Sequence, residues 1–584
     1  MASEHGCLIY EKKEEVVRPY VFVIALFVIY LVLALQLGRV QILEHDKYQK
    51  LADRQHYKRV EIPAHRGSIL DRSGKILAHS IETHSIYANP QEIEDKASVS
   101  EKLASALGLD VSRIQKVLDK DKKFVWIKRD VGKKEVQAVE ELDLAGVDIQ
   151  QEGRRSYPCG KLLSQVLGFV DVDGKGLEGL ELAFDRELTG RPGYKVVNRD
   201  GKQRVIFKTE NPCIPPVNGD NIVLTVDLAL QYILEEELDK VFEHRKPLSA
   251  TAIAMDPATG EILALSSRPT FDPNFFTLSS ADQRRNRAIT DSYEPGSVIK
   301  PLVVSGVLQQ GLISSKEVIF CHNGVYQIGR RTLRDVHPYG NLTVEEIVVN
   351  SSNIGMSKVA AKSGDKGMYE ALRLFDLGRP TGINLPGEAG GMLRHYKKWT
   401  SYSGASIAMG YEVTATPLQM ITAYCAIANG GTLLKPKIIT ATVDGGDGAT
   451  KKLSERAPGR QILARDVAAG VMTPVLTRVV DEGTGKSAAV EGYKVAGKTG
   501  TAKRIDTTAK GYGNAGYVSS FIGYAPADKP RICVLVMVNK PSGGAYYGGT
   551  VAAPVVGEIL RRSLNHMESI AGLSDGSGIN KKTI

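Results

Sequence analysis

A serine and a lysine stand three positions apart in a stretch of the sequence that is otherwise apolar. They are Ser297 and Lys300, within "EPGSVIKPLVVSGVLQQG". At this spacing both side chains project from one face of a helix, which we expect Ser297 to open. A serine hydroxyl has to lose its proton to attack a carbonyl, and a lysine that burial has deprotonated can accept it. The pair therefore predicts a serine nucleophile with a lysine base.

The spacing alone does not identify the nucleophile, because it occurs a second time in the chain. Ser363 and Lys366 repeat it, but Gly364 and Asp365 between them favour a polar turn and a solvated lysine. The motif therefore has to be judged by its surroundings.

A cluster of polar residues interrupts another apolar, helical stretch, "VVNSSNIGMSKVAA", which contains Ser351 and Asn353. A hydroxyl and a carboxamide two residues apart at a helix entrance can face one cleft. The alternative is that the cluster caps the following helix, and both roles can hold together. A second S-x-N, Ser563 to Asn565, lies near the end of the last expected helix without such surroundings.

The third candidate element is Lys498-Thr499-Gly500-Thr501, which follows the strand-like "YKVA". In a strand the two threonines lie on one face, and the glycine lets a ligand approach the backbone. Such a strand edge can bind an extended peptide, and the lysine suits a substrate carboxylate. The alternative, a β-turn in a basic loop, is weakened by the preceding strand pattern.

The order S-x-x-K, S-x-N, K-T-G resembles the active-site signature of class B penicillin-binding proteins. These are membrane-anchored peptidoglycan D,D-transpeptidases of the serine β-lactamase superfamily. The segments "RGSILDRSGKILA" and "RRSYP…GLEGLE" are similar to their N-terminal pedestal. The chain most resembles the division-specific FtsI type in "RNRAITDSYEPGSVIKP", "VEEIVVNSSNIGMSKVA" and "AMGYEVTATPLQM". Elongation-specific relatives commonly have Asp in place of Asn353, which counts against that subtype.

The resemblance implies a role for each catalytic residue. Ser297 would attack the carbonyl between the two terminal D-Ala residues of a stem peptide, and Lys300 would take its proton. The backbone N–H groups of Ser297 and Thr501 would form the oxyanion hole. Ser351 would relay a proton to the leaving D-Ala, while Asn353 would bond Lys300 and the substrate amide.

The resemblance also implies how substrates and partners bind. Lys498, Thr499 and Thr501, with Gly500 between them, would hold the terminal carboxylate of the peptide or of a β-lactam. An amine of a neighbouring stem peptide would resolve the acyl-enzyme, with no metal or cofactor. The implied partners are an FtsW-type lipid II polymerase and other divisome proteins.

Three other functions remain open at this stage. The chain could be an elongation-specific transpeptidase, a β-lactam-hydrolysing or β-lactam-sensing relative, or an inactive scaffold. No convincing deacylating-glutamate motif stands between the second and third elements, and a long pedestal would be superfluous for hydrolysis.

An apolar stretch near the N-terminus predicts a membrane anchor. Tyr20 to Leu35 is continuously apolar, and about 20 such residues span a hydrocarbon core of about 30 Å. The alternatives are a buried core helix, for which the stretch is too apolar on every face, and a cleaved signal peptide, whose apolar region is usually shorter. We expect an uncleaved anchor over 19–41. Flanking charges leave its orientation open, whereas the resemblance implies a cytoplasmic tail over 1–18 and an extracytoplasmic remainder in the bacterial inner membrane, at the septum.

Beyond the anchor we expect an α+β protein with two domains. A non-catalytic, β-rich pedestal of the dimerisation type would cover 42–220, with a helix to about 60, a hairpin turning at Arg72–Lys75 and helices over 97–142. A transpeptidase domain would cover 221–567. It would contain an antiparallel sheet built from both ends of the domain and a mostly helical insert over 297–430. The tail, 568–584, has a composition typical of disorder.

The amino-acid composition excludes few classes of protein. The 584 residues carry 75 Lys and Arg against 66 Asp and Glu, a net charge of +9 that is spread along the chain. No nucleic-acid-binding signature accompanies it. The six cysteines form no C-x-x-C pair, so zinc is disfavoured. Cys425 and Cys533 lie in apolar runs and are expected to be buried, while a disulfide among the others stays open.

Overall fold

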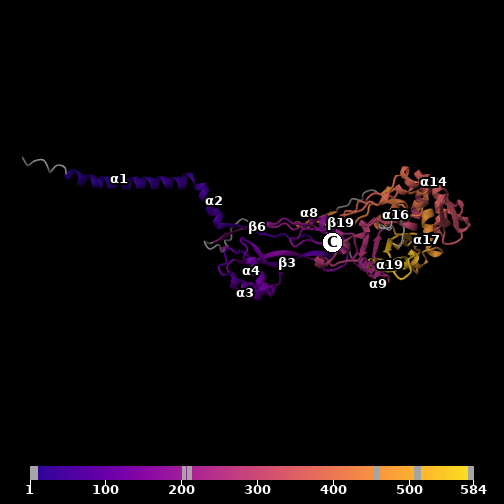
Figure 1. Cartoon of the computed structure of the whole chain (residues 1–584), viewed down its shortest axis with the longest axis horizontal. Helices are drawn as coiled ribbons and strands as arrows, with labels where there is room; N and C mark the ends of the chain where they lie inside the picture. The colour runs from indigo at the N-terminus through magenta and orange to yellow at the C-terminus, as the bar shows by residue number, and fades with distance from the viewer. Residues whose placement is uncertain (1–10, 200–204, 207–212, 453–458, 505–514, 577–584) are drawn as a thin grey trace, which may run out of the picture. The chain divides into compact units, whose positions relative to one another are not determined.

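The protein is described by a computed structural model (Figure 1). The model describes residues 11–199, 205–206, 213–452, 459–504 and 515–576. The chain divides into two compact units. The first comprises the chain up to Ala64 together with Arg191–Val217, and the second comprises His65–Gly190 and the chain from Asn218 onward.

The first unit contains the apolar helix. A span of 25 residues, Pro19–Leu43, has a mean hydropathy of 2.7 and is long and apolar enough to cross a membrane. It includes the predicted anchor. The unit continues into a small sheet in which β6 pairs with β1, β7 and β8. Its elements are α1 Glu11–Gly38, the π-turn η1 Arg39–Leu43, α2 His45–His56, β1 Tyr57–Ile62, β6 Gly193–Arg199, β7 Val205–Ile206 and β8 Cys213–Ile214.

The second unit begins with a seven-stranded sheet of order β20-β19-β9-β2-β3-β4, in which β5 also pairs with β3. Its strands are β2 Ile69–Leu70, β3 Ile76–Ala88, β4 Val125–Val131, β5 Val147–Ser156, β9 Asn221–Leu224, β19 Ile439–Val443 and β20 Thr450–Lys452. The predicted turn between β2 and β3 is confirmed, because Asp71 Oδ1 accepts bonds from Ser73 N and Lys75 N at 2.8 Å each. This sheet joins strands from both sides of the predicted boundary at residues 220 and 221.

The prediction of helices over 97–142 is wrong in the middle. The helices are α3 Lys96–Leu107, α4 Val111–Leu118 and α5 Lys133–Glu140. Between α4 and α5 lies the strand β4, whose Val125, Ile127 and Val131 are buried in a local core. The apolar residues of this segment alternate with polar ones, and that period of two outweighed the helical propensity of its lysines.

A buried ion network ties the three pedestal motifs together. The Glu181 carboxylate is fully buried, and its two oxygens accept from Arg66 Nε and Arg155 Nε at 2.7 Å each. The Tyr157 hydroxyl lies 3.3 Å from the same carboxylate. One carboxylate therefore holds the segments "RGSIL", "RRSYP" and "GLEGLE" side by side.

The sheet predicted from both ends of the transpeptidase domain is confirmed. It is antiparallel, with the order β11-β10-β24-β23-β22. The strands are β10 Ser249–Met255, β11 Ile262–Arg268, β22 Ala496–Lys503, β23 Tyr517–Ala525 and β24 Ile532–Asn539. Ala252 and Ala254 of β10 pack with helices α9 and α19, whereas Ile253 and Met255 face the helical insert. Both faces of the sheet are therefore covered.

The helices that cover the sheet are α9 Leu228–Arg245, α12 Lys300–Gln309, α13 Val344–Val349, α14 Asn353–Arg373, α16 Pro417–Ala428, α17 Thr473–Asp481, α18 Gly548–Val551 and α19 Ala553–Gly576. The insert is less helical than expected, because small hairpins separate α12 from α13. The last helix extends to Gly576, past the expected end at 567. The rest of the expected tail, 577–584, lies outside the described residues.

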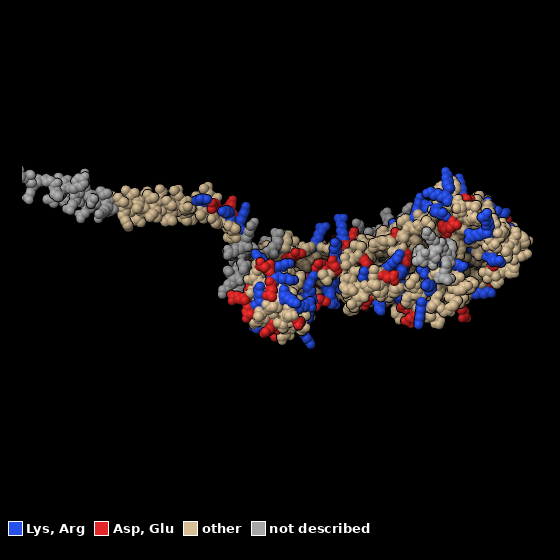
Figure 2. Space-filling model, in the orientation of Figure 1, with Lys and Arg blue, Asp and Glu red and all other residues tan. Residues whose placement is uncertain are grey.

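The distribution of surface charge and the burial of two cysteines agree with the expectations from the sequence. Acidic and basic side chains are interspersed on the face shown in Figure 2. Cys425 and Cys533 are buried as predicted. All five cysteines of the described residues are free thiols, and Cys7 lies outside those residues.

The ion network generates a stability prediction. Glu181→Ala leaves Arg155 buried without a carboxylate and leaves Arg66 with Asp185 alone, which costs about 3–5 kcal/mol of unfolding free energy. We expect a clearly lower midpoint in urea unfolding of the solubilised chain, followed by circular dichroism. Glu370→Ala is the matched control, since it removes an exposed partner of Lys366 and should cost less than about 1 kcal/mol. Equal losses for the two variants would contradict the assignment.

Candidate active site

Ser297 lies in a short 3-10 turn, η3 Gly296–Ile299, and the α-helix α12 begins at Lys300. The expectation that Ser297 opens the α-helix is therefore wrong by three residues. Gly296 has a φ of +58°, which favours glycine. A Cβ at this position would lie 3.1 Å from both Ala502 Cβ and Thr501 O. The missing side chain lets η3 pack directly against β22.

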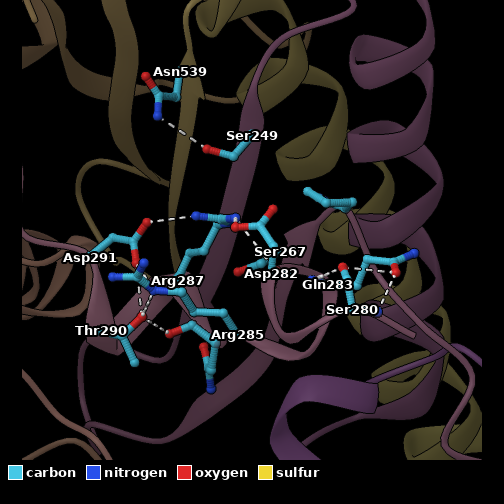
Figure 3. Close-up of polar contacts among 12 residues, drawn as sticks. Ser249, Ser267, Ser280, Asp282, Gln283, Arg285, Arg287, Thr290, Asp291 and Asn539 are labelled. Carbon is cyan, nitrogen blue, oxygen red and sulfur yellow. Dashed lines mark hydrogen bonds and ion pairs between the residues drawn. The ribbon is translucent and has the colours of Figure 1, made fainter. Parts of the chain in front are cut away.

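Two further contacts hold η3 and the segment before it in place. The buried Tyr424 hydroxyl donates to Val298 O at 2.7 Å. In the preceding segment, the Arg287 guanidinium lies between Asp282 and Asp291, at 2.5 and 2.9 Å (Figure 3). Tyr424 therefore anchors the turn that carries the nucleophile, and Arg287 orders the segment that leads into it.

Lys300 is the fully buried centre of the site. Its Nζ donates to Ser351 O at 2.6 Å and to Asn353 Oδ1 at 2.9 Å, and lies 3.2 Å from Ser351 Oγ. The structure thus brings the first two motifs together. Burial lowers the pKa of Lys300 from 10.5 to about 7, although the negative charge of Asp335 acts in the opposite direction. A lysine with this pKa can both accept and release a proton near neutral pH.

No hydrogen bond joins Lys300 to Ser297 within the described part of the chain. Catalytic hydrogen bonds often tighten only when substrate is bound. The transfer of a proton from Ser297 to Lys300 therefore stays a prediction.

The structure separates capping from catalysis in the polar cluster. Ser352 caps α14, because its Oγ accepts from Gly355 N at 2.8 Å. Ser351 has a φ of +58° and turns toward Lys300, as does Asn353. The two roles considered for this cluster hold together, on different residues.

Asp335 is a residue of the site that the sequence analysis missed. Its Oδ1 accepts from the backbone N–H groups of Asn353 and Ile354 at 2.5 and 3.1 Å, and its Oδ2 accepts from Ser352 Oγ at 2.6 Å. A carboxylate at this helix N-terminus is favoured by the helix dipole. It holds the turn that presents Ser351 and Asn353, and no local pattern around "TLRDVHP" signals this role.

Lys498 is also fully buried, and its Nζ lies 3.3 Å from Thr499 Oγ1. Burial and the nearby charge of Lys300 together lower the pKa of Lys498 well below 10.5. A substrate carboxylate would offset this effect by restoring an opposite charge. Thr499 Oγ1 lies 2.6 Å from Thr484 Oγ1, and Thr501 Oγ1 accepts from Gly548 N at 3.0 Å.

Gly500 packs against protein on its crowded side. A Cβ there would overlap Ser520 Oγ and lie 2.9 Å from Val298 Cγ1. The glycine is therefore required by the contact between β22 and η3, a reason that the sequence analysis did not anticipate. Among the described strands, β22 pairs only with β23, so its other edge is available for an extended peptide.

The two decoy motifs lie elsewhere in the fold. Ser363 is buried in α14 and donates to Val359 O, while Lys366 is exposed, as predicted. Ser563 is buried in α19. No group of three His, Cys, Asp or Glu side chains in the described ranges is arranged to hold a metal ion.

Comparisons with known proteins match both parts of the chain. The model of the penicillin-binding protein dimerisation domain matches residues 61–224, and that of the penicillin-binding protein transpeptidase domain matches 250–561. The chain is 36% identical over 508 residues to the probable peptidoglycan D,D-transpeptidase PenA of Neisseria meningitidis, covering 86% of this chain and 85% of the relative. It is 33% identical over 549 residues to the peptidoglycan D,D-transpeptidase FtsI of Escherichia coli, covering 92% and 90%.

Solved structures show the same fold. The penicillin-binding protein 3 of Mycobacterium tuberculosis in complex with aztreonam matches with a TM-score of 0.68 at 29% identity, covering 88% of this chain and 98% of that one. A peptidoglycan synthetase from Bifidobacterium adolescentis matches with a TM-score of 0.70 at 28% identity, covering 88% and 97%.

The fold and the three motifs define a serine-type transpeptidase with a penicillin-binding domain. More narrowly, the chain belongs to the class B penicillin-binding proteins, the peptidoglycan D,D-transpeptidases that carry a dimerisation domain before the transpeptidase domain.

The pKa of Lys300 generates a prediction for the pH dependence of acylation. Below about pH 7 the amine is protonated and cannot act as base. The second-order rate constant for acylation by penicillin should therefore rise about tenfold per pH unit below that point and level off above it. Stopped-flow or gel-based labelling of the solubilised chain measures this. A flat profile between about pH 5.5 and about pH 8.5 would remove Lys300 as the base.

Asp335→Asn provides a directional test of the same pKa. The amide retains an acceptor for the N–H groups of α14 but loses the charge that raises the pKa of Lys300. The inflection should move to lower pH. Asp291→Asn serves as control, since it removes a carboxylate that binds Arg287 and should leave the inflection in place. An upward shift in Asp335→Asn would overturn this account.

Proposed function

We propose that the chain is a division-specific transpeptidase, which cross-links stem peptides during septal wall synthesis. The observation that carries this proposal is Asn353. The residue bonds Lys300 at the position where elongation-specific relatives commonly have Asp. The similarity to FtsI of Escherichia coli over most of the chain supports the same conclusion.

In the proposed reaction, Lys300 takes the proton of Ser297 as the Ser297 oxygen attacks the carbonyl between the terminal D-Ala residues. The backbone N–H groups of Ser297 and Thr501 stabilise the resulting oxyanion, each by about 3–4 kcal/mol. Ser351 passes the proton to the leaving D-Ala. Its hydroxyl lies 3.2 Å from Lys300 Nζ, which supports this relay.

The substrate lies along the open edge of β22 in this proposal. Its terminal carboxylate binds Lys498, Thr499 and Thr501, with the backbone of Gly500 alongside. The amine of a second stem peptide then attacks the ester, which forms the cross-link and frees Ser297. A β-lactam follows the same route as far as the acyl-enzyme.

The apolar helix α1 supports a single-pass membrane protein. The resemblance to class B penicillin-binding proteins supports a short N-terminus in the cytoplasm. The catalytic domain then lies outside the inner membrane, where stem peptides are available. An FtsW-type lipid II polymerase and other divisome proteins are the proposed partners.

Labelling with a fluorescent penicillin tests the residue roles. Ser297→Ala should abolish the covalent label, because it removes the hydroxyl proposed to attack the β-lactam carbonyl, whereas the Ser351 hydroxyl is assigned to the proton relay. Ser363→Ala is the matched control, since it changes the decoy serine and should retain the label. Rapid release of hydrolysed penicillin from the parent chain would instead support a β-lactamase, and loss of label only in Ser363→Ala would refute the site.

The cellular role has a separate test. A fluorescent fusion to the N-terminus of the full chain should concentrate at mid-cell in dividing bacteria. Enrichment along the lateral wall in its place would favour the elongation-specific alternative. The Ser297→Ala fusion controls for effects of activity on position.

A further inference from the structure

A cavity lies in the transpeptidase domain apart from the catalytic motifs. Its volume is about 810 Å³, within the range of pockets that bind small ligands. It is bounded by the turn that joins β10 to β11, the end of α16, the start of α17 and the turn that joins β23 to β24. None of the residues assigned to the reaction lines it.

Positive charge predominates around the cavity. Four cationic side chains and one carboxylate line it: Arg465, Arg478, Lys494, Lys529 and Asp528. Arg478 is paired with Glu482 at 2.5 Å. The other three cations form no ion pair with any residue that the structure describes. The cavity therefore favours an anionic ligand that brings more than one carboxylate.

Small apolar residues make up one part of the cavity lining, which we call its floor. Ala428, Pro474, Ala527 and Pro530 line it. Asn429 fixes one wall, because its Nδ2 donates to Pro257 O and Thr432 O at 2.9 and 2.8 Å. Such a floor accepts small apolar side chains, such as those of alanine, without rearrangement.

A π-helical turn, η6 Asp466–Met472, forms part of the wall and runs directly into α17. Turns of this kind are rare and occur frequently at functional sites. At the junction, Thr473 Oγ1 lies 2.8 Å from the hydroxyl of the fully buried Tyr524. This bond ties the start of α17, directly after the irregular turn, to the sheet.

We propose that this cavity is a second, non-catalytic binding site for an uncross-linked, acidic stem peptide. The identity of the ligand rests on the proposed function, since that function places stem peptides next to this domain. Carboxylates of the peptide pair with Arg465, Lys494 and Lys529, and its alanine methyl groups pack on the apolar floor. The site holds one stem peptide of the polymer while the catalytic site acts on the terminus of that peptide or on a neighbouring stem peptide.

The test measures binding of the N-acetylated tripeptide L-Ala-γ-D-Glu-diaminopimelate, which lacks the terminal D-Ala residues that the reaction needs. Titration calorimetry uses the full chain in detergent, both with Ser297 acylated by penicillin and as Ser297→Ala. We expect saturable binding in both forms. The triple variant Arg465→Glu, Lys494→Glu, Lys529→Glu should raise the dissociation constant at least about tenfold.

Controls separate this site from general charge effects. Lys398→Glu reverses an exposed charge outside the cavity and should leave the dissociation constant unchanged. The tripeptide with its carboxylates amidated should not bind. The triple variant should still be labelled by penicillin, which shows that it folds. If the triple Glu variant is not labelled, a variant with Gln at the same three positions replaces it.

Several results would overturn the proposal. They are an absence of saturable binding, equal weakening by Lys398→Glu, equal binding of the amidated peptide, or binding of inorganic phosphate as tight as that of the tripeptide. A different result would contradict the proposed function, namely the absence of a penicillin label at Ser297. Peptide binding by Ser297→Ala does not depend on that label.

Discussion

The active site depends on the removal of one ammonium group from water. Lys300 is fully buried, and its pKa falls to about 7 because the low-dielectric interior disfavours the charged form. Three oxygens from Ser351 and Asn353 surround its nitrogen, so the proton it carries is never without a partner. A buried lysine without these acceptors would destabilise the fold, and one with a full countercharge beside it would not release its proton.

The rest of the domain maintains the balance between burial of the Lys300 ammonium and the opposing negative charge. Asp335 supplies a negative charge that partly opposes the effect of burial, and it also fixes the turn that carries the oxygen acceptors. Gly296 and Gly500 allow η3 and β22 to touch, which brings a second buried lysine, Lys498, into the electrostatic field of the first. The charge of Lys300 makes Lys498 easier to deprotonate, and an anionic group bound beside Lys498 would oppose this effect.

The motif residues and the central sheet could be predicted because their signals are local. Spacing in a helix placed Lys300 near Ser297, and strand alternation with turn residues gave β10, β11 and β22 to β24. Asp335 could not be predicted, since its partners are the backbone N–H groups of a helix that begins later in the chain. The packing reason for Gly500 was likewise hidden, because it depends on a side chain of β23. Contacts between distant segments set these features, and single-sequence patterns do not report them.

The seven-stranded sheet has a consequence for how such proteins can evolve. In it β9, at the start of the catalytic segment, pairs in parallel with β2 of the preceding segment and antiparallel with β19. A gene exchange that joined two parental sequences between residues 220 and 221 would replace β2, one pairing partner of β9, and keep β19, the other. A recombinant would keep this pairing only where the new β2 sequence preserves the register with β9, so the two family domains are coupled through one parallel strand pair.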